Sequence, residues 1–128
     1  ADVALVVAYG RILPSDVLFD TASADLKPAA GPALAAVARQ IQRQAPDATL
    51  RITGFTDSRG AEDYNQDLSE RRAESVKAWF ISAGFRADRL YTRGAGESAL
   101  LLIDTDRFGR FDEVAGQRNR RVEIQVFP

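Results

Sequence analysis

The sequence predicts an α/β fold (an α+β sandwich) of order βαβαββ, with two main helices packed on one face of a mixed sheet. Two segments, 26–45 and 69–83, carry apolar residues at helical spacing. Short segments that alternate polar and apolar side chains lie before, between and after them. The 128 residues are 45% hydrophobic and 27% charged, which suits one globular domain. Helices and strands in this order form a two-layer sandwich.

The N-terminal part is predicted to hold an extension over residues 1–14, and the domain proper to span residues 15–128. The apolar run 3–9 favours a strand, because crossing a bilayer takes about 20 residues. Val17–Phe19 is predicted as a further short strand. Because the chain contains no Met, we expect a processed product or a fragment, with any export signal or membrane anchor upstream.

The first helix is predicted over Leu26–Ala45, where apolar residues recur every three or four positions. Pro28 and Pro32 fit only near a helix start, so the regular part is expected to begin between them. Pro46 ends the helix. Thr49–Thr53 alternates polar and apolar residues as a half-buried strand does.

The second helix is predicted to begin at Asp67 or Ser69 and to end at Ala83. Residues 94–117 are predicted as mostly loop, in which the apolar stretch 100–103 forms a strand or packs as a flap. Two further strands are predicted at 89–93 and 122–126.

Residue types that are missing exclude several classes of site. The chain has no Cys and no His, which removes disulfides, thiolate nucleophiles and the commonest metal ligand. We therefore expect no metal, no cofactor and no enzymatic activity, although carboxylate chemistry stays open. The formal net charge of −1 creates no overall field that would attract nucleic acid.

Arg72 is the anomaly of the second helix. On a helical wheel it lies near the middle of the apolar stripe that includes Leu68 and Val76. Its neighbour Arg71 lies among charged residues on the opposite face. An arginine keeps its charge, so a partly buried one needs an anionic partner. A structural ion pair, a side chain that extends to water and a bound ligand all remain compatible with this position.

Two other charged residues stand out. Arg120 shares the parity of the apolar residues in Val122–Val126, so we expect it to point inward, at the rim of the sheet or into a cleft, and Arg121 to point outward. Asp57 lies in the Gly-rich loop after the Thr49–Thr53 strand. An aspartate there either caps its own backbone or is held by N–H groups and aimed at a cation, and the spacing does not choose between the two.

Three sequence blocks occur in order: GFTDSRG at 54–60, NQDLSERRA at 65–73 and NRRVEI at 119–124. Together they resemble the signature of the OmpA-like C-terminal (peptidoglycan-binding) domain family, found in OmpA-, Pal- and MotB-type envelope proteins. Val17–Asp20 followed by Leu26 resembles the first strand and the start of the first helix in that family. The resemblance spans about residues 15–127.

The resemblance implies a ligand, the diaminopimelate residue of the peptidoglycan stem peptide, whose side chain ends in an ammonium and a carboxylate on one carbon. It places the family's aspartate on Asp57, for the ammonium, and the family's arginine on Arg72, for the carboxylate. An arginine can hold a carboxylate in two parallel bonds, and the start of the second helix is expected to add a favourable field. Thr56, Asn65 and Arg120 fall on positions that line the same cleft.

The function that the resemblance implies is non-covalent attachment of an envelope protein or assembly to the wall. The expected location is the periplasm, with the parent protein tethered to the outer or inner membrane through a segment outside this sequence. Peptidoglycan is the expected partner, with further envelope proteins open and no nucleic acid. Two positions depart from the family, because Phe55 stands where His or Tyr is frequent and Ala22 where some members have a polar residue.

Two alternative functions remain on the sequence. One is a protein-interaction module of an envelope machine, such as a secretion system or a stator, that uses the long loop within 98–118 and the N-terminal extension. The other is a wall hydrolase that pairs Asp57 with Asp63 or Asp67, because such an enzyme needs two carboxylates across a cleft.

Overall fold

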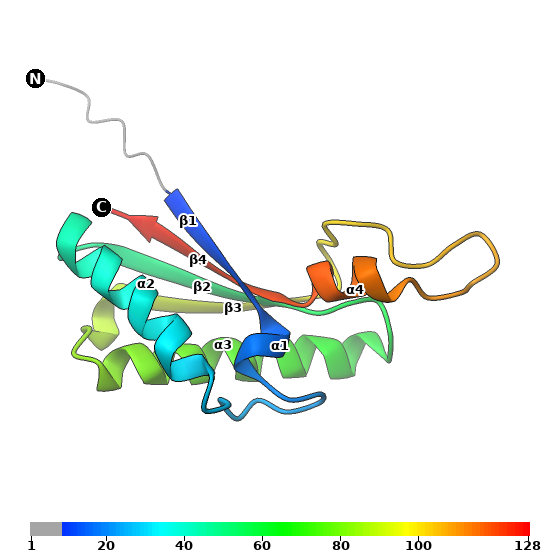
Figure 1. Ribbon diagram of the computed structural model, residues 1–128, viewed down its shortest axis with the longest axis horizontal. Helices are drawn as coiled ribbons and strands as arrows, with labels where there is room; N and C mark the ends of the chain where they lie inside the picture. Colours follow the sequence, from blue (N-terminus) through cyan, green and yellow to red (C-terminus); the bar gives the residue numbers. More distant parts are fainter. Residues whose placement is uncertain (1–8) are drawn as a thin grey trace, which may run out of the picture.

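Two layers make up the fold of residues 9–128, which the computed structural model describes. One layer is a four-stranded sheet, and the other consists of helices α2 (Ala30–Gln44) and α3 (Glu62–Ser82), which lie on the same face of that sheet (Figure 1). The predicted fold class is therefore confirmed. Within the described residues, no helix combines the length and the apolar character needed to cross a membrane.

The sheet is mixed and has the strand order β1-β4-β2-β3. Strand β4 pairs antiparallel with both β1 and β2, whereas β2 and β3 are parallel and are connected through α3. A parallel pair needs such a crossover, because a tight turn cannot return the chain to the same end of the sheet. The strands span Tyr9–Pro14 (β1), Thr49–Phe55 (β2), Leu90–Gly96 (β3) and Arg121–Phe127 (β4).

The core lies between the sheet and the two long helices. Alternate residues of β2 and β4 point toward the helices, since successive side chains of a strand take opposite faces. The inward residues of both strands are fully buried and meet apolar side chains of α2 and α3. The core cluster includes Leu34, Ile41, Leu50, Ile52, Val76, Phe80, Ile124 and Val126.

The predicted strand at Val17–Phe19 is wrong. Ser15–Leu18 instead forms the short helix α1, and Phe19 makes only an isolated bridge with Leu26. The backbone N–H of Ser15 donates to the carbonyl of Arg120 at 3.0 Å, next to the last β1–β4 pair, Pro14 and Arg121, and the helical turn begins at that residue. Three apolar residues in a row are too few to separate a buried helical turn from a strand.

Residues 9–14 of the predicted extension form β1, the edge strand of the sheet. The predicted strand at 3–9 falls almost entirely outside the described residues. The domain boundary at residue 15 stays a prediction, although the pairing of β1 with β4 places residues 9–14 inside the same sheet.

Helix α3 begins at Glu62, earlier than predicted. Its N-cap residue, Ala61, makes no side-chain capping bond, so the usual Ser, Thr, Asn or Asp signal is missing. The first turn is acidic, with Glu62 and Asp63, and carries no apolar stripe that would extend the pattern. Arg72 therefore lies in the middle of a 21-residue helix and not in its first turn.

The predicted loop over 94–117 contains a helix that the sequence did not indicate, α4 (Glu113–Asn119). It is only seven residues long, and the Asp112 carboxylate caps it by accepting N–H bonds from Val114 and Ala115. The stretch 100–103 is neither a strand nor a packed flap, because its apolar side chains are exposed and Ile103 is 86% accessible.

Two paired glycines set how closely α3 approaches the sheet. Gly54 of β2 and Gly94 of β3 lie side by side, and a Cβ on either residue would overlap atoms of Ser69 or Glu70. The small residues thus let the helix backbone rest directly on the strand ends. This contact brings the side chains of α3 beside the loop that follows β2.

Candidate functional site

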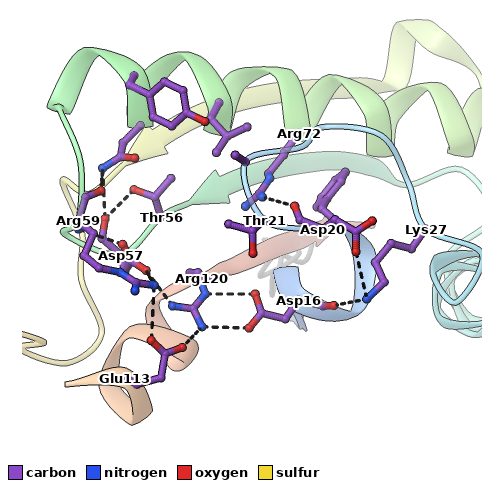
Figure 2. Close-up of a pocket in the computed structure, with 15 residues that line it drawn as sticks. Asp16, Asp20, Thr21, Lys27, Thr56, Asp57, Arg59, Arg72, Glu113 and Arg120 are labelled. Carbon is purple, nitrogen blue, oxygen red and sulfur yellow. Dashed lines mark hydrogen bonds and ion pairs between the residues drawn. The ribbon is translucent and has the colours of Figure 1, made fainter. Parts of the chain in front are cut away.

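An open cavity of about 590 Å³ lies where α1, the loop after β2 and α3 meet (Figure 2). All five residues expected from the sequence line it. Thr56 and Asp57 follow β2, Asn65 and Arg72 lie on α3, and Arg120 connects α4 to β4. Other charged residues on its walls are Asp16, Asp20, Lys27, Arg59 and Glu113.

The Asp57 carboxylate is buried and hydrogen-bonded on both oxygens. Its Oδ1 accepts the backbone N–H of Arg59 at 2.9 Å, which is the local cap that its place in a turn suggests. Its Oδ2 accepts from Nη1 of Arg120 at 2.8 Å and from Nη2 of Arg59 at 3.0 Å. One oxygen of Asp57 thus caps the turn, and the other bonds to two arginines of the protein.

Arg120 is the most heavily paired cation of the cavity. Its guanidinium contacts Asp16 through two bonds of 3.0 and 3.1 Å, Glu113 at 2.6 Å and Asp57 at 2.8 Å. The hydrogen bond to Asp16, followed by those to Asp57 and Glu113, raises the pKa of Arg120, although partial burial acts in the opposite direction. The pair with Asp57 is buried on both sides and is therefore poorly screened by solvent, whereas Asp16 and Glu113 are largely exposed.

Arg72 is more deeply buried than Arg120, and its partners are neutral. Its Nε donates to the carbonyl of Ser23 at 2.8 Å and its Nη2 to the carbonyl of Asp20 at 3.1 Å. Phe19 lies against the guanidinium, 5.0 Å from ring centre to Cζ. Among the described residues, no carboxylate lies within ion-pair distance of Arg72, and burial lowers the pKa of its guanidinium while Asp16 counteracts this.

We expected the N-terminus of the second helix to add a favourable electrostatic field near Arg72, and this expectation is wrong. That field fades within the first turn, and Arg72 lies far from the start of α3 at Glu62. The positive potential at this wall of the cavity comes from the guanidinium itself. The predicted stripe is otherwise confirmed, because Leu68, Arg72 and Val76 are all buried on one side of α3.

Thr56 and Asn65 hold the loop that carries Asp57. The Thr56 hydroxyl donates to the carbonyl of Asp57 at 2.9 Å. The Asn65 amide donates to the carbonyl of Arg59 at 2.7 Å and to Glu97 at 3.1 Å. Both side chains are buried and already bonded within the protein, so their observed contacts are those of loop supports at the cavity wall.

Arg121 does not extend outward into solvent as predicted. It shares a sheet face with Glu123, its partner at 2.7 Å, but it is only 3% exposed. Its guanidinium stacks 3.7 Å from the ring centre of Phe55 and donates to the carbonyls of Ala99 and Asn119. Strand parity gave the correct face, but the chain segment after β3 covers that end of it. The ring of Phe55 is thus already in contact with the guanidinium of Arg121.

Sequence reasoning missed Asp16, Arg59 and Glu113 as residues of the cavity. Arg59 lies in the GFTDSRG block, two positions after Asp57, and this was the available signal. Asp16 and Glu113 carry no local signal, because they reach the cavity from helices far apart in the chain. Ala22, which also lines the cavity, adopts a left-handed backbone with φ of 60°.

The carboxylates proposed for a hydrolase are not brought together. Asp63 and Asp67 lie on the exposed side of α3, where Asp67 pairs with Arg71 at 2.8 Å, and neither lines the cavity. In residues 9–128 no cluster of three acidic side chains is arranged to hold a metal ion. What the cavity offers is a buried cation on one wall and a carboxylate between arginines on another.

Comparisons with known proteins place this arrangement in a family. Residues 18–109 match the model of the OmpA family. The chain belongs to the OmpA family. This membership confirms the resemblance that the three sequence blocks indicated. The match runs from the last residue of α1 through β3 into the following loop, and so includes Asp57 and Arg72.

Relatives and solved structures agree with the OmpA assignment. The chain is 36% identical over 116 residues to probable lipoprotein YiaD of Escherichia coli (strain K12), and 42% identical over 120 residues to outer membrane protein A of Escherichia fergusonii. These matches cover 91% and 89% of this chain but 50% and 49% of the relatives, so the chain spans about half their length. The structure of the cell wall anchor of the T6SS from Pseudomonas aeruginosa superposes with a TM-score of 0.79 at 26% identity, over 94% of this chain and 81% of that one.

Proposed function

We propose that this OmpA-family domain binds peptidoglycan non-covalently through the diaminopimelate residue of the stem peptide, and thereby anchors an envelope protein or assembly to the cell wall in the periplasm. The family membership and the similarity to a protein described as a cell wall anchor support the wall as partner. The choice of diaminopimelate rests on the cavity.

The observation that supports this ligand is the incomplete set of hydrogen bonds around the Arg72 guanidinium. Two of its five N–H groups bond to carbonyls, which leaves Nη1 and one N–H of Nη2 without a partner among the described residues. These groups form one end of the planar guanidinium, which matches the two oxygens of a carboxylate. Phe19 and the two carbonyls hold the group in place, so little freedom is lost when an anion binds.

The ammonium of the same ligand carbon is assigned to Asp57. Its Oδ1 accepts only the backbone bond from Arg59, and a carboxylate oxygen can accept a second one. The Arg59 side chain is 54% exposed and also reaches Glu113, so it is the arginine that an ammonium displaces most easily. Arg120 stays in place, since Asp16 holds it independently.

Binding without reaction fits the chemistry of this cavity. The Asp57 Oδ2 is bonded to the guanidinium groups of both Arg59 and Arg120, and Asp63 and Asp67, the carboxylates considered for a hydrolase, do not line the cavity. We therefore propose a wall-binding module and not an enzyme. A single zwitterion buries little surface, so the affinity of one site is expected in the ~µM to mM range, and several copies on one assembly would gain by avidity.

The same proposal includes the context of the parent protein. Its attachment to the outer or inner membrane through a segment outside this sequence, and its contacts with other envelope proteins, are inferred from the envelope proteins to which the chain is similar.

The test is an NMR titration of the domain with a stem peptide that contains diaminopimelate, beside one that contains lysine instead. We expect saturable shifts at Asp57 and Arg72 with the first peptide, and at least tenfold weaker binding of the second, which lacks the carboxylate on the terminal carbon. Equal affinity for both peptides would contradict the assignment of Arg72. No binding of either peptide would contradict the proposed function.

A further inference from the structure

A buried carboxylate outside the cavity lining has no cationic partner among the described residues. Asp104 belongs to the long segment between β3 and α4 and is 1% exposed. No ion pair joins it to any of the described residues, unlike the carboxylates of the cavity. A buried carboxylate is costly unless hydrogen bonds satisfy its oxygens, so its bonds show what it stabilises.

The bonds of Asp104 reach the sequence neighbours of Asp57 and Arg120. Its Oδ2 accepts the backbone N–H of Ser58 at 3.0 Å and the side-chain amide of Asn119 at 3.0 Å. Its Oδ1 accepts the Ser58 hydroxyl. One carboxylate thus connects the residue after Asp57 with the residue before Arg120.

We infer that Asp104 is a positioning residue of the wall-ligand site, which fixes the loop of Asp57 against the turn that carries Arg120. The inference rests on the proposed function, because it concerns the geometry of that same site. The ion pair between Asp57 and Arg120 is a direct contact of the two segments, and Asp104 provides a second, indirect contact through Ser58 and Asn119. Because the two contacts involve different residues of each segment, together they restrict the position of Asp57 relative to Arg120 more than the ion pair does alone.

The other supports of the Asp57 loop do not replace this contact. Thr56 donates its N–H to the carbonyl of Gly96 at 2.8 Å, and Asn65 of α3 donates to the carbonyl of Arg59. Both connect the loop to β3 and α3. On the side of β4, the β2–β4 ladder ends at the pair Phe55 and Arg121, and Arg59 reaches Glu113 of α4 through an exposed ion pair of 3.5 Å. Asp104 adds a buried contact beyond the end of that ladder, between Ser58 and Asn119.

Asn119 fixes the backbone of the segment that carries Asp104. Its Oδ1 accepts the N–H groups of Leu101 and Leu102, and its amide also donates to the carbonyl of Leu102. The segment that carries Asp104 is therefore fastened to the end of α4 by four bonds from one side chain. The exposed apolar stretch 100–103 thus has a fixed backbone, since a buried network of this kind resists opening.

The test compares three variants for affinity to the diaminopimelate stem peptide. Asp104→Ala removes all acceptors. Asp104→Asn loses one acceptor but keeps bonds to the same partners, because its carbonyl accepts from Ser58 N–H and Asn119 while its amide donates to the Ser58 hydroxyl, which turns to accept. Asp106→Ala is the matched control, since Asp106 lies in the same segment but bonds only to Phe108 and Arg110 at its exposed tip.

We expect Asp104→Ala to weaken binding about tenfold or more, and Asp104→Asn and Asp106→Ala to stay within about threefold of the unaltered protein. Thermal melts select a temperature at which all four proteins are folded. Unchanged affinity of folded Asp104→Ala, or an equal loss in Asp106→Ala, overturns the inference. Should Asp104→Ala not fold, Ser58→Ala replaces it, with an expected loss of a few-fold, and unchanged affinity then overturns the inference.

A separate readout distinguishes this inference from the proposed function. If the unaltered protein does not bind the peptide, the proposed function fails, and the positioning role is judged on ligand-free protein. NMR shifts of the Asp57 carboxyl carbon and the Arg120 Nε–H are expected to change in Asp104→Ala and to stay in place in Asp106→Ala. Unmoved signals in Asp104→Ala would show that Asp104 does not position the pair.

Discussion

Two arginines face the same cavity, and their surroundings are opposite. Arg120 contacts three carboxylates and is electrostatically saturated. Arg72 contacts two carbonyls and one aromatic ring and keeps one end of its guanidinium free within the described part of the chain. Sequence patterning predicted both as inward arginines and could not rank them.

The difference indicates a division of labour. A buried cation whose charge is fully paired stabilises the protein that surrounds it, and removing it leaves uncompensated carboxylates. A buried cation held by neutral groups keeps an unused electrostatic interaction, which an anionic ligand can satisfy. Arg72 is therefore expected to matter more for binding than for stability, and Arg120 more for stability than for binding.

The largest expected effect is the loss of binding in Arg72→Ala. We expect affinity for the diaminopimelate stem peptide to fall about 100-fold, or about 2.7 kcal/mol, because a buried charged pair loses one partner. Arg72→Lys keeps the charge but not the planar fork, so an intermediate loss is expected. Isothermal titration calorimetry measures both variants.

Arg71→Ala is the matched control for that experiment, because Arg71 is the neighbouring exposed arginine and pairs only with Asp67. Its affinity is expected to equal that of the unaltered protein. An equal loss in Arg71→Ala and Arg72→Ala would show that general positive charge, and not the buried guanidinium, attracts the ligand.

The next effect is on stability. Arg120→Ala leaves Asp16, Asp57 and Glu113 close together without their shared cation. We expect the free energy of unfolding to fall by about 2 kcal/mol, compared with about 1 kcal/mol for Arg72→Ala, whose carbonyl partners can bond to water instead. Urea denaturation at neutral pH measures both. The reverse order would remove the distinction between the two arginines.

A smaller effect concerns acid stability. Burial would raise the pKa of Asp104, but hydrogen bonds from Ser58, Asn119 and Thr105 outweigh it and hold the pKa below its ordinary value. Because the folded pKa is the lower one, the ionised group contributes stability above its unfolded pKa of about 3.9 and loses it as pH falls further. The stability advantage of the unaltered protein over Asp104→Asn should therefore shrink between pH 7 and pH 3. Urea unfolding at several pH values checks this, and a constant difference would speak against it.

The smallest effect is expected for Arg59→Ala. Arg59 is half exposed and competes with the ligand ammonium for Asp57, so its removal should tighten binding by at most about threefold. Calorimetric titration with the same stem peptide measures this change. A strong loss of affinity would instead assign Arg59 to the ligand and contradict its role as the displaceable arginine.

The sequence determined more of the fold than of the site. The two main helices and the strands from β2 onward follow from apolar spacing, since the periods of a helix and of a strand differ and each element buries one side. The start of α3 was wrong because its first turns are polar and lack a capping side chain. Helix α4 was missed because its seven residues are mostly polar and show no recurring spacing of apolar residues.

For the site, the sequence by itself determined the unusual place of Arg72, since a charge within an apolar stripe is visible without coordinates. The pattern also drew attention to Asp57 and Arg120, and the resemblance gave them a ligand and added Thr56 and Asn65; all of these residues line one cavity. Only the tertiary structure decided the pairing of these charges. Arg120 meets Asp16 from the other end of the chain, and Asp104 meets Ser58 from the long segment after β3. Such contacts depend on how the elements pack, and a local sequence pattern records only what each element buries.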